Sequence, residues 1–416
     1  MRSLSLVWLA LMLPLADAPA FGETPRAVTE MTIVLAGDAG FGADPRGSAK
    51  ANIFYAYPEP AALIKGEIDG DLNFVNVETV VSERTGLVAD DKGQARPFSF
   101  RMHPAGLRHL VDSGFNLLSL ANNHSMDFGV EGLKDTLKHV DALRGKGVLA
   151  AAGIGLNRNE AVRAHLVKVK GRTVAFSALG IVTNNLERHR AGPDRPGQIA
   201  YRFDEDFREG LERLRAAPAA FRVLSIHYGY EGKVRADALQ LAQWRGDAAQ
   251  RGGIDLIVGH HAHVVRGVEM AGKSLIFYGL GNFLHHGTAN MTANPVCKDY
   301  GLMARVHVRF APGGAAAIRA VEVLPLTDTH SRVRRLPPEQ GALRVHVLNH
   351  LASTLDDGAA GARGLRFTPQ KDGSGLYCVR GAAKDGGRIG QLCKDYNAPS
   401  PIPETRRRDI EAACAQ

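Results

Sequence analysis

Histidines gather at one point of this sequence, where a buried strand is expected to end. Gly259-His260-His261-Ala262-His263 directly follows the apolar run Ile254–Val258. Imidazole is the commonest protein ligand of transition metals. In an extended segment His261 and His263 would point to the same side, whereas His260 would face elsewhere. The spacing therefore predicts that two of these histidines reach one metal centre.

The same arrangement, a short apolar run followed by a metal-capable polar side chain, recurs along the chain. Open α/β sheets carry their sites outside the carboxyl ends of the strands, so these side chains are expected to converge. Mixed oxygen and nitrogen ligands suit one or two divalent cations, and they do not distinguish Mn, Fe and Zn. The candidate metal ligands are Asp38, Glu78, Asn123, His227, His261 and His263, and His124 leaves the same strand as Asn123.

Each candidate also has an ordinary structural explanation. An aspartate after glycine, as at Asp38, is typical of a turn or a helix cap. We expect His260 to be a neighbour rather than a ligand, and His285-His286, in a glycine-flanked loop, to face solvent. Metal-free packing of the other histidines is the alternative. The joint pattern favours a metal centre, because so many buried imidazoles would compete for hydrogen-bond partners.

Short apolar runs alternate with amphipathic stretches from Met31 onward, which predicts βα units. A hairpin is expected over residues 302–310 and 317–324, with Pro312-Gly313-Gly314 as its turn. We divide the chain into a main domain over residues 31–330 and a small, basic, partly loose region over residues 331–416. Strands are expected at 32–36, 71–77, 117–120, 173–179, 223–226, 256–258 and 274–278, and helices at 104–112, 130–144, 204–216, 237–251 and 338–354.

The N-terminus predicts export. Arg2 precedes an apolar run over residues 4–15, and Ala18-Pro19-Ala20 offers a cleavage site, so residues 1–20 are expected to be a secretion signal. The mature protein would then be periplasmic or extracellular. Cys297, Cys378, Cys393 and Cys414 would be free to form disulfides there. Cys378 and Cys393 are closest in sequence, and the connectivity stays open.

The formal net charge of +8 favours anionic partners such as phosphoesters or an anionic polymer, unless the positive charges are scattered. Basic motifs interleaved with aromatic residues, typical of nucleic-acid binders, are absent from the sequence, so no nucleic-acid partner is expected.

Six motifs together resemble one known family. Their order and spacing over about residues 31–330 are similar to those of the CapA (PgsA) family of capsule and poly-γ-glutamate biosynthesis proteins. That family resembles the calcineurin-like metallophosphoesterases, which implies an α/β fold, a four-layer αββα sandwich with a dinuclear metal site. The motifs are Gly37-Asp38, Asn76-Val77-Glu78, the segment 121–129 (ANNHSMDFG), the segment 227–231 (HYGYE), the segment 259–264 (GHHAHV) and the segment 278–283 (YGLGNF).

The resemblance also implies roles for the candidate residues. Asp38 and His263 would hold one metal, and Glu78 would bridge to the other. Asn123, His227 and His261 would hold that second metal. His124 would be the acid that protonates the leaving oxygen.

The sequence departs from the metallophosphoesterase pattern at several positions. Gly40 stands where a metal-binding histidine is expected, which favours weak binding of one ion or a one-metal site. The bridging carboxylate is the longer Glu78 instead of an aspartate. Ser125 replaces the acidic neighbour of the catalytic histidine, so Asp127 is expected to orient His124 from one helical turn on. Arg266 stands where CapA relatives often carry glutamine.

Two functions follow as expectations. The first is an exported metal-dependent hydrolase of phosphoesterase type, which uses metal-activated water in capsule or poly-γ-glutamate metabolism. The alternative is a non-catalytic metal- or polymer-binding accessory of a membrane complex that synthesises or exports polyglutamate.

Overall fold

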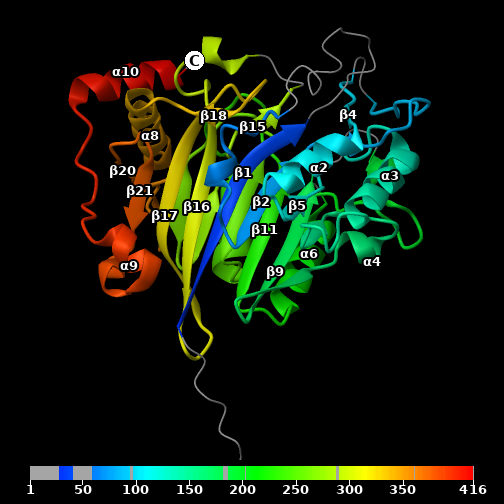
Figure 1. The fold of residues 1–416 in the computed structure, drawn as a ribbon, viewed down its shortest axis with the longest axis horizontal. Coiled ribbons are helices and arrows are strands. Elements are labelled where there is room, and N and C mark those ends of the chain that lie inside the picture. Colours follow the sequence, from blue (N-terminus) through cyan, green and yellow to red (C-terminus); the bar gives the residue numbers. More distant parts are fainter. Residues whose placement is uncertain are drawn as a thin grey trace, which may run out of the picture.

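The computed structural model describes residues 28–40, 59–93, 97–180, 186–201, 203–286, 290–359 and 361–415. The expected secretion signal over residues 1–20 lies outside these ranges. Two large sheets pack face to face, and helices cover the outer face of each sheet (Figure 1). The predicted α/β sandwich with αββα layers is thereby confirmed.

The first sheet has ten strands in the described residues, and β1 lies at its centre. On one side β1 pairs in parallel with β2; on the other it pairs antiparallel with β16 and, at its carboxyl end, in parallel with β15. In sheet order the strands are β20 (Thr368–Pro369), β21 (Gly375–Cys378), β17 (Ala316–Thr327), β16 (Gly301–Phe310), β1 (Thr29–Gly40), β2 (Leu72–Val77), β5 (Leu117–Ser119) and β6 (Ala150–Ala152), with β15 (Asn282–His285) beside β1 and β18 (Arg334–Arg335) beside β17.

The second sheet has seven strands, and its four central ones, β14, β12, β11 and β9, run parallel. In sheet order the strands are β19 (Ala362–Gly364), β13 (Val268–Ala271), β14 (Ser274–Phe277), β12 (Leu256–His260), β11 (Phe221–His227), β9 (Arg172–Gly180) and β8 (His165–Val169). Two small pairs complete the described strands: β3 (Val80–Val81) with β4 (Arg101–Met102), and β7 (Ile154–Gly155) with β10 (Gly197–Gln198).

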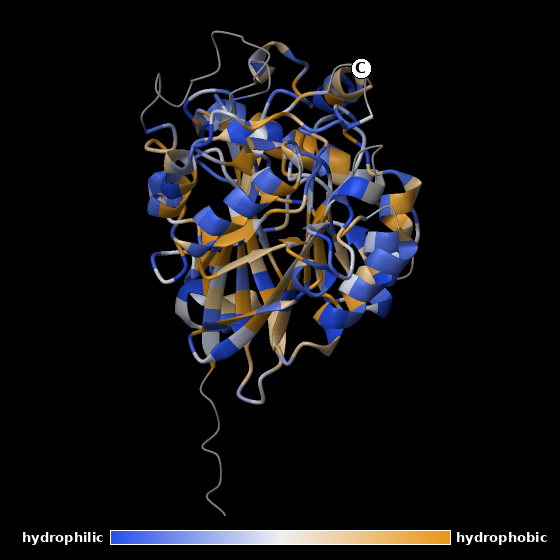
Figure 2. Ribbon diagram, turned by 90° about the vertical axis from the view of Figure 1, so that its right-hand side faces the viewer, coloured by the Kyte–Doolittle hydropathy of each residue, from blue (hydrophilic) through white to orange (hydrophobic). Residues whose placement is uncertain are grey.

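The strand sequences explain why the sheets stack. Successive side chains of a strand point to opposite faces, so a strand that is apolar throughout can bury both faces. Ile33 and Leu35 of β1 lie in the core between the sheets, whereas Val34 and Ala36 lie under the outer helices. Figure 2 shows the apolar strands at the centre of the molecule, with hydrophilic residues along the outer helices.

Amphipathic helices cover both outer faces. On the first sheet, Leu107 of α2 (Pro104–Asp112) and Leu133 of α3 (Gly129–Asp141) pack against β1 and its neighbours. On the second sheet lie α6 (Asp204–Ala216) and α7 (Ala238–Gln240), which continues as the π-helix η2 (Leu241–Arg251). Asp237 caps α7 by accepting a hydrogen bond from the backbone of Gln240.

The short helices are α4 (Arg158–Ala161), α5 (Leu186–His189), η1 (Lys65–Glu67) and η3 (Met291–Ala293). None of the helices in the described residues is both long and apolar enough to cross a bilayer.

The C-terminal residues are joined to both sheets, although we expected a partly loose region over 331–416. β21 pairs with β17, and β19 pairs with β13. Disulfides link Cys297 to Cys414 and Cys378 to Cys393. The domain boundary near residue 330 stays a prediction. The helices of this region are α8 (Pro338–Ser353), η4 (Ala382–Lys384), α9 (Gly387–Cys393) and α10 (Glu404–Cys414).

Candidate metal centre

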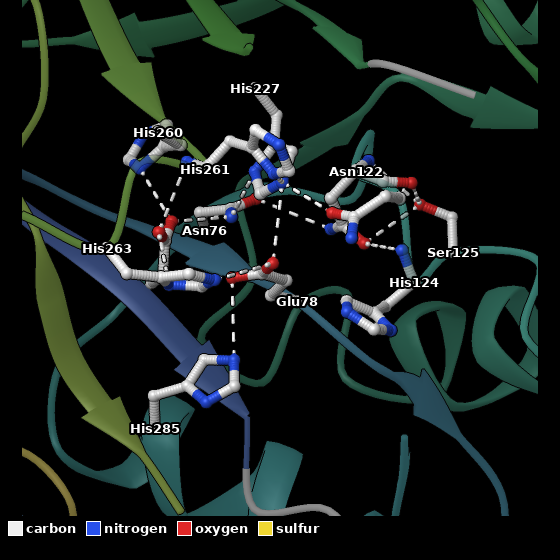
Figure 3. A network of polar contacts seen from close by, with 12 residues as sticks. Asn76, Glu78, Asn122, His124, Ser125, His227, His260, His261, His263 and His285 are labelled. Atoms are coloured by element: carbon white, nitrogen blue, oxygen red, sulfur yellow. Dashed lines mark hydrogen bonds and ion pairs between the residues drawn. The ribbon is translucent and has the colours of Figure 1, made fainter. Parts of the chain in front are cut away.

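The candidate ligands converge at the carboxyl ends of parallel strands from both sheets. Asp38 lies near the end of β1 and Glu78 directly follows β2, while Asn123 and His124 lie a few residues beyond β5. His227 is the last residue of β11, and His261 and His263 follow β12. Figure 3 shows Glu78 with His227, His263 and His285 around it. The structure thus brings every predicted site residue into one region.

Glu78 is the centre of this cluster. Its carboxylate is fully buried, and neither oxygen makes a hydrogen bond with the described residues. Oε1 lies 3.4 Å from His227 Nε2 and 3.8 Å from His263 Nε2, and Oε2 lies 3.5 Å from His285 Nε2. A buried carboxylate is costly unless a charge or hydrogen bonds compensate it. This carboxylate therefore has the surroundings of a cation ligand.

A first ligand group forms around His227. Its Nε2 lies 2.7 Å from Asn123 Oδ1 and 3.1 Å from His261 Nδ1. One donor atom each from Glu78, His227 and His261 lie within 4.8 Å of one another, which is close enough for all three to contact one ion. On the other side of the ring, His227 Nδ1 lies 3.1 Å from the Asn76 amide nitrogen, and this contact fixes the orientation of the imidazole.

Asp38 contacts residues that surround this group. Its Oδ1 accepts a hydrogen bond of 2.9 Å from the Asn76 amide, and its Oδ2 lies 3.5 Å from His263 Nδ1. We expected the His260 side chain to face away from the site, but its Nδ1 lies 3.0 Å from Asp38 Oδ1. Its ring stacks on Phe74. His260 is thus a neighbour of the candidate ligand Asp38.

The backbone at the histidine cluster corrects the premise that this segment is extended. Strand β12 ends at His260, and His261 and His263 adopt the left-handed region, with φ of 84° and 55°. Both imidazoles still reach the cluster. They do so because the chain turns after β12, and not because they lie on the same face of an extended strand. A non-glycine residue in this region costs about 1–2 kcal/mol, so the turn stores strain at the site.

His285 is the histidine that the sequence analysis placed wrongly. We expected His285 and His286 to face solvent, yet both are buried. The reason is that β15 pairs in parallel with the end of β1, with His285 opposite Gly40, which draws this segment into the sheet. One donor atom each from Glu78, His263 and His285 lie within 4.8 Å of one another and form a second ligand group.

The electrostatics of the cluster favour positive charge at its centre. Burial opposes ionisation of Glu78, but attraction from His263 and His227 outweighs it and holds the pKa of Glu78 well below its ordinary value. Burial also opposes the charge on His263, but Glu78 and Asp38 attract that charge and raise the pKa of His263 to about 10. Burial, together with repulsion from His227 and His263, lowers the pKa of His261 well below its ordinary value.

His124 belongs to a separate chain of polar contacts beside the cluster. Its Nδ1 lies 2.6 Å from Asp127 Oδ2, the pairing expected in place of an acidic residue at position 125. The other oxygen of Asp127 accepts a hydrogen bond of 2.6 Å from Lys92, and the side chains of Lys92 and Asp127 are almost fully buried. Burial lowers the pKa of His124, against the attraction of Asp127. The sequence analysis did not identify Lys92, because it selected polar residues that follow a strand and Lys92 does not follow one.

Arg266, one of the departures noted above, is fully buried. Its guanidinium donates to the backbone oxygens of Lys233 (2.7 Å) and Tyr230 (2.9 Å) and to Gln240 Oε1 (2.6 Å). It therefore fixes the loop that follows His227.

Comparison with known proteins gives one family. The model of the family described as "Bacterial capsule synthesis protein PGA_cap" matches residues 32–286. The chain is 28% identical over 263 residues to the "PGA biosynthesis protein CapA" of Bacillus subtilis (strain 168), which covers 62% of this chain and 64% of that protein. It is 31% identical over 200 residues to the "Capsule biosynthesis protein CapA" of Bacillus anthracis, which covers 47% and 46%.

A third relative is the "Probable polyglutamine synthesis accessory protein" of Mycobacterium tuberculosis (strain ATCC 25618 / H37Rv), 32% identical over 222 residues that cover 51% of this chain and 55% of that protein. The chain thus covers less than two thirds of the length of each of these relatives. The family match, in contrast, spans more than half of the 416 residues. On that match, the chain belongs to the PGA_cap family of bacterial capsule synthesis proteins.

Proposed function

We propose that this protein is a divalent-cation-dependent hydrolase of phosphoesterase type that acts in capsule or polyglutamate metabolism. The observation that carries the proposal is the buried carboxylate of Glu78, which lacks a hydrogen bond among the described residues and is surrounded by imidazoles from several strands. Such a carboxylate is stable only when positive charge lies beside it.

The donor set fits a divalent cation. Glu78, His227 and His261 would hold the ion, with the Asn123 amide oxygen next to them. One carboxylate, two imidazoles and an amide oxygen suit Mn, Fe or Zn. A bound cation would lower the pKa of a water ligand and polarise the oxygen of a phosphoryl or carbonyl group.

His124 would donate a proton to the leaving group. Asp127 accepts the hydrogen bond of Nδ1, so Nε2 is left to exchange a proton with the departing oxygen. Lys92 fixes the other oxygen of Asp127, and the Phe100 ring lies 4.3 Å from the His124 ring between centroids. These contacts hold the imidazole in one orientation and keep water from one side of it.

A non-catalytic role is the second candidate function, and one surface feature favours it. A pocket of about 340 Å³ is lined by three cationic side chains and no acidic one. Such a pocket suits the carboxylates of a polyglutamate chain. Its lining residues are Gly232, Lys233, Val234, Arg235, Lys298, Cys414 and Ala415.

We also infer that the protein is exported and meets an anionic phosphoester or polymer, with a membrane synthase complex as a further partner. The two disulfides support an oxidising compartment, because disulfides are rare in the reducing cytosol.

The test is metal analysis followed by a substrate panel on the full chain. Purified protein should contain bound divalent metal and should hydrolyse an activated phosphomonoester or phosphodiester. Chelation should abolish turnover, and Mn²⁺ should restore it. Bound metal and retention of poly-γ-glutamate without any turnover would favour the accessory role. Protein that binds no divalent metal would overturn the hydrolase proposal.

A further inference from the structure

We propose that His285 is a cation ligand and forms, with Glu78 and His263, a second metal position beside that of Glu78, His227 and His261. The inference rests on the proposed function, because both positions share Glu78. It differs from the sequence-based expectation, in which Gly40 leaves one ion weakly bound or absent.

The Glu78 carboxylate contacts imidazoles of both ligand groups. Oε1 lies near His227 and His263, whereas Oε2 lies 3.5 Å from His285 Nε2. The rings of His263 and His285 meet edge to face, with centroids 5.2 Å apart, so their nitrogens approach the carboxylate from different directions. Oε1 thus faces one imidazole of each group and Oε2 faces His285, and a carboxylate placed between two ligand groups in this way can bridge two ions.

Gly40 and His285 occupy one location in the sheet. They are register partners in the β1–β15 pair, and a Cβ built at position 40 would lie 3.2 Å from the backbone oxygen of Glu78 and 3.6 Å from His285 Nε2. The His285 imidazole therefore lies in contact distance of position 40, where a longer side chain would meet it. Position 40 of β1 lacks the histidine of the metallophosphoesterase pattern. His285 of the neighbouring strand β15 supplies an imidazole there.

The position of His285 is fixed by its surroundings. The side chain is 2% exposed. Its backbone N–H donates to Thr329 O at 2.7 Å, and the next N–H, of His286, donates to Gly40 O at 2.9 Å. The Phe100 ring packs edge-on against the imidazole, with centroids 5.5 Å apart. A ligand held in this way is preorganised, since its orientation does not have to be found upon binding.

The experiment compares Mn²⁺ binding to the wild-type chain, His285→Ala and His285→Gln, with His286→Ala as the matched control. His286 is the adjacent buried histidine, but its Nε2 faces the backbone oxygen of Ser331 at 3.1 Å. We expect two Mn²⁺ per chain for wild type and His286→Ala. Both His285 variants should keep one ion and bind the second at least about tenfold more weakly. Equilibrium dialysis with elemental analysis measures both quantities.

The outcomes separate the two proposals. A wild-type chain that binds no divalent metal overturns the proposed function and this inference together. Bound Mn²⁺ with the same stoichiometry and affinity in wild type and both His285 variants overturns the second position alone.

A measurement on wild type keeps the test valid should the variants misfold. Two Mn²⁺ that share Glu78 would lie about 3.5–4 Å apart, so their electron paramagnetic resonance spectrum should show exchange coupling. A spectrum of isolated ions at saturating Mn²⁺ would contradict the inference.

Discussion

The two ligand groups that share Glu78 differ in origin. His227 and His261 come from the ends of β11 and β12, which are neighbouring parallel strands of the second sheet. His263 and His285 come from different sheets, because His285 lies on β15 beside β1. The two imidazoles of the first group therefore come from adjacent strands of one sheet, whereas the two imidazoles of the second meet only because the two sheets pack against each other.

The two groups also differ in depth. The side chain of His227 is fully buried, whereas that of His263 is 20% exposed. We call Glu78, His227 and His261 the inner group, and Glu78, His263 and His285 the outer group, because only the second includes a partly exposed imidazole, that of His263.

The largest effect is expected from Glu78→Gln, because Glu78 belongs to both groups. Removing its charge should weaken Mn²⁺ binding at both positions by about a hundredfold or more. Isothermal titration calorimetry measures the loss, and Glu83→Gln, at a partly exposed glutamate paired with His139, is the control. Two ions bound with wild-type affinity by Glu78→Gln would show that the two groups do not share this ligand.

His261→Ala should remove only the inner ion. We expect one Mn²⁺ per chain, because His263 and His285 still surround Glu78. Elemental analysis after dialysis gives the stoichiometry. Loss of both ions would mean that the outer group binds only when the inner one is filled, and no loss would remove His261 from the ligand set.

His260→Ala should have a smaller effect than His261→Ala. His260 contacts Asp38 and stacks on Phe74, so it orients a ligand and does not bind the ion. Both ions should remain, with an affinity reduced about tenfold. A stoichiometry as low as that of His261→Ala would show that His260 is itself a ligand.

His124→Ala should leave metal binding unchanged and affect only chemistry. Because His124 pairs with Asp127 beside the cluster, its loss should lower turnover of an activated phosphoester by about 10²–10⁴-fold. Metal content and far-UV circular dichroism should match wild type. Turnover equal to wild type would exclude His124 as the acid.

The predictable part of the fold and site is what strand periodicity encodes. The apolar runs before Asp38, His227 and His260 predicted strands, and those strands are present as β1, β11 and β12. Because parallel strands carry their sites at one edge, the convergence of their polar ends could also be expected.

The rest depends on tertiary contacts that a local pattern does not encode. The sequence around His285 is typical of a loop, because β15 is short and pairs with β1 at its end. Lys92 lies outside the regular elements, yet it is buried against Asp127. The left-handed turn at His261 and His263 could not be predicted, since residues other than glycine rarely adopt this conformation and tertiary packing must hold them in it.

The order of strands in the first sheet also decides how this protein can be truncated. The family match ends at residue 286, but β1 pairs along most of its length with β16, which begins at Gly301. A fragment cut at residue 286 would expose an unpaired apolar edge and lose Val306 and Phe310 from between the sheets. Such an edge invites aggregation through added strands. The autonomous folding unit is therefore longer than the segment by which the family is detected.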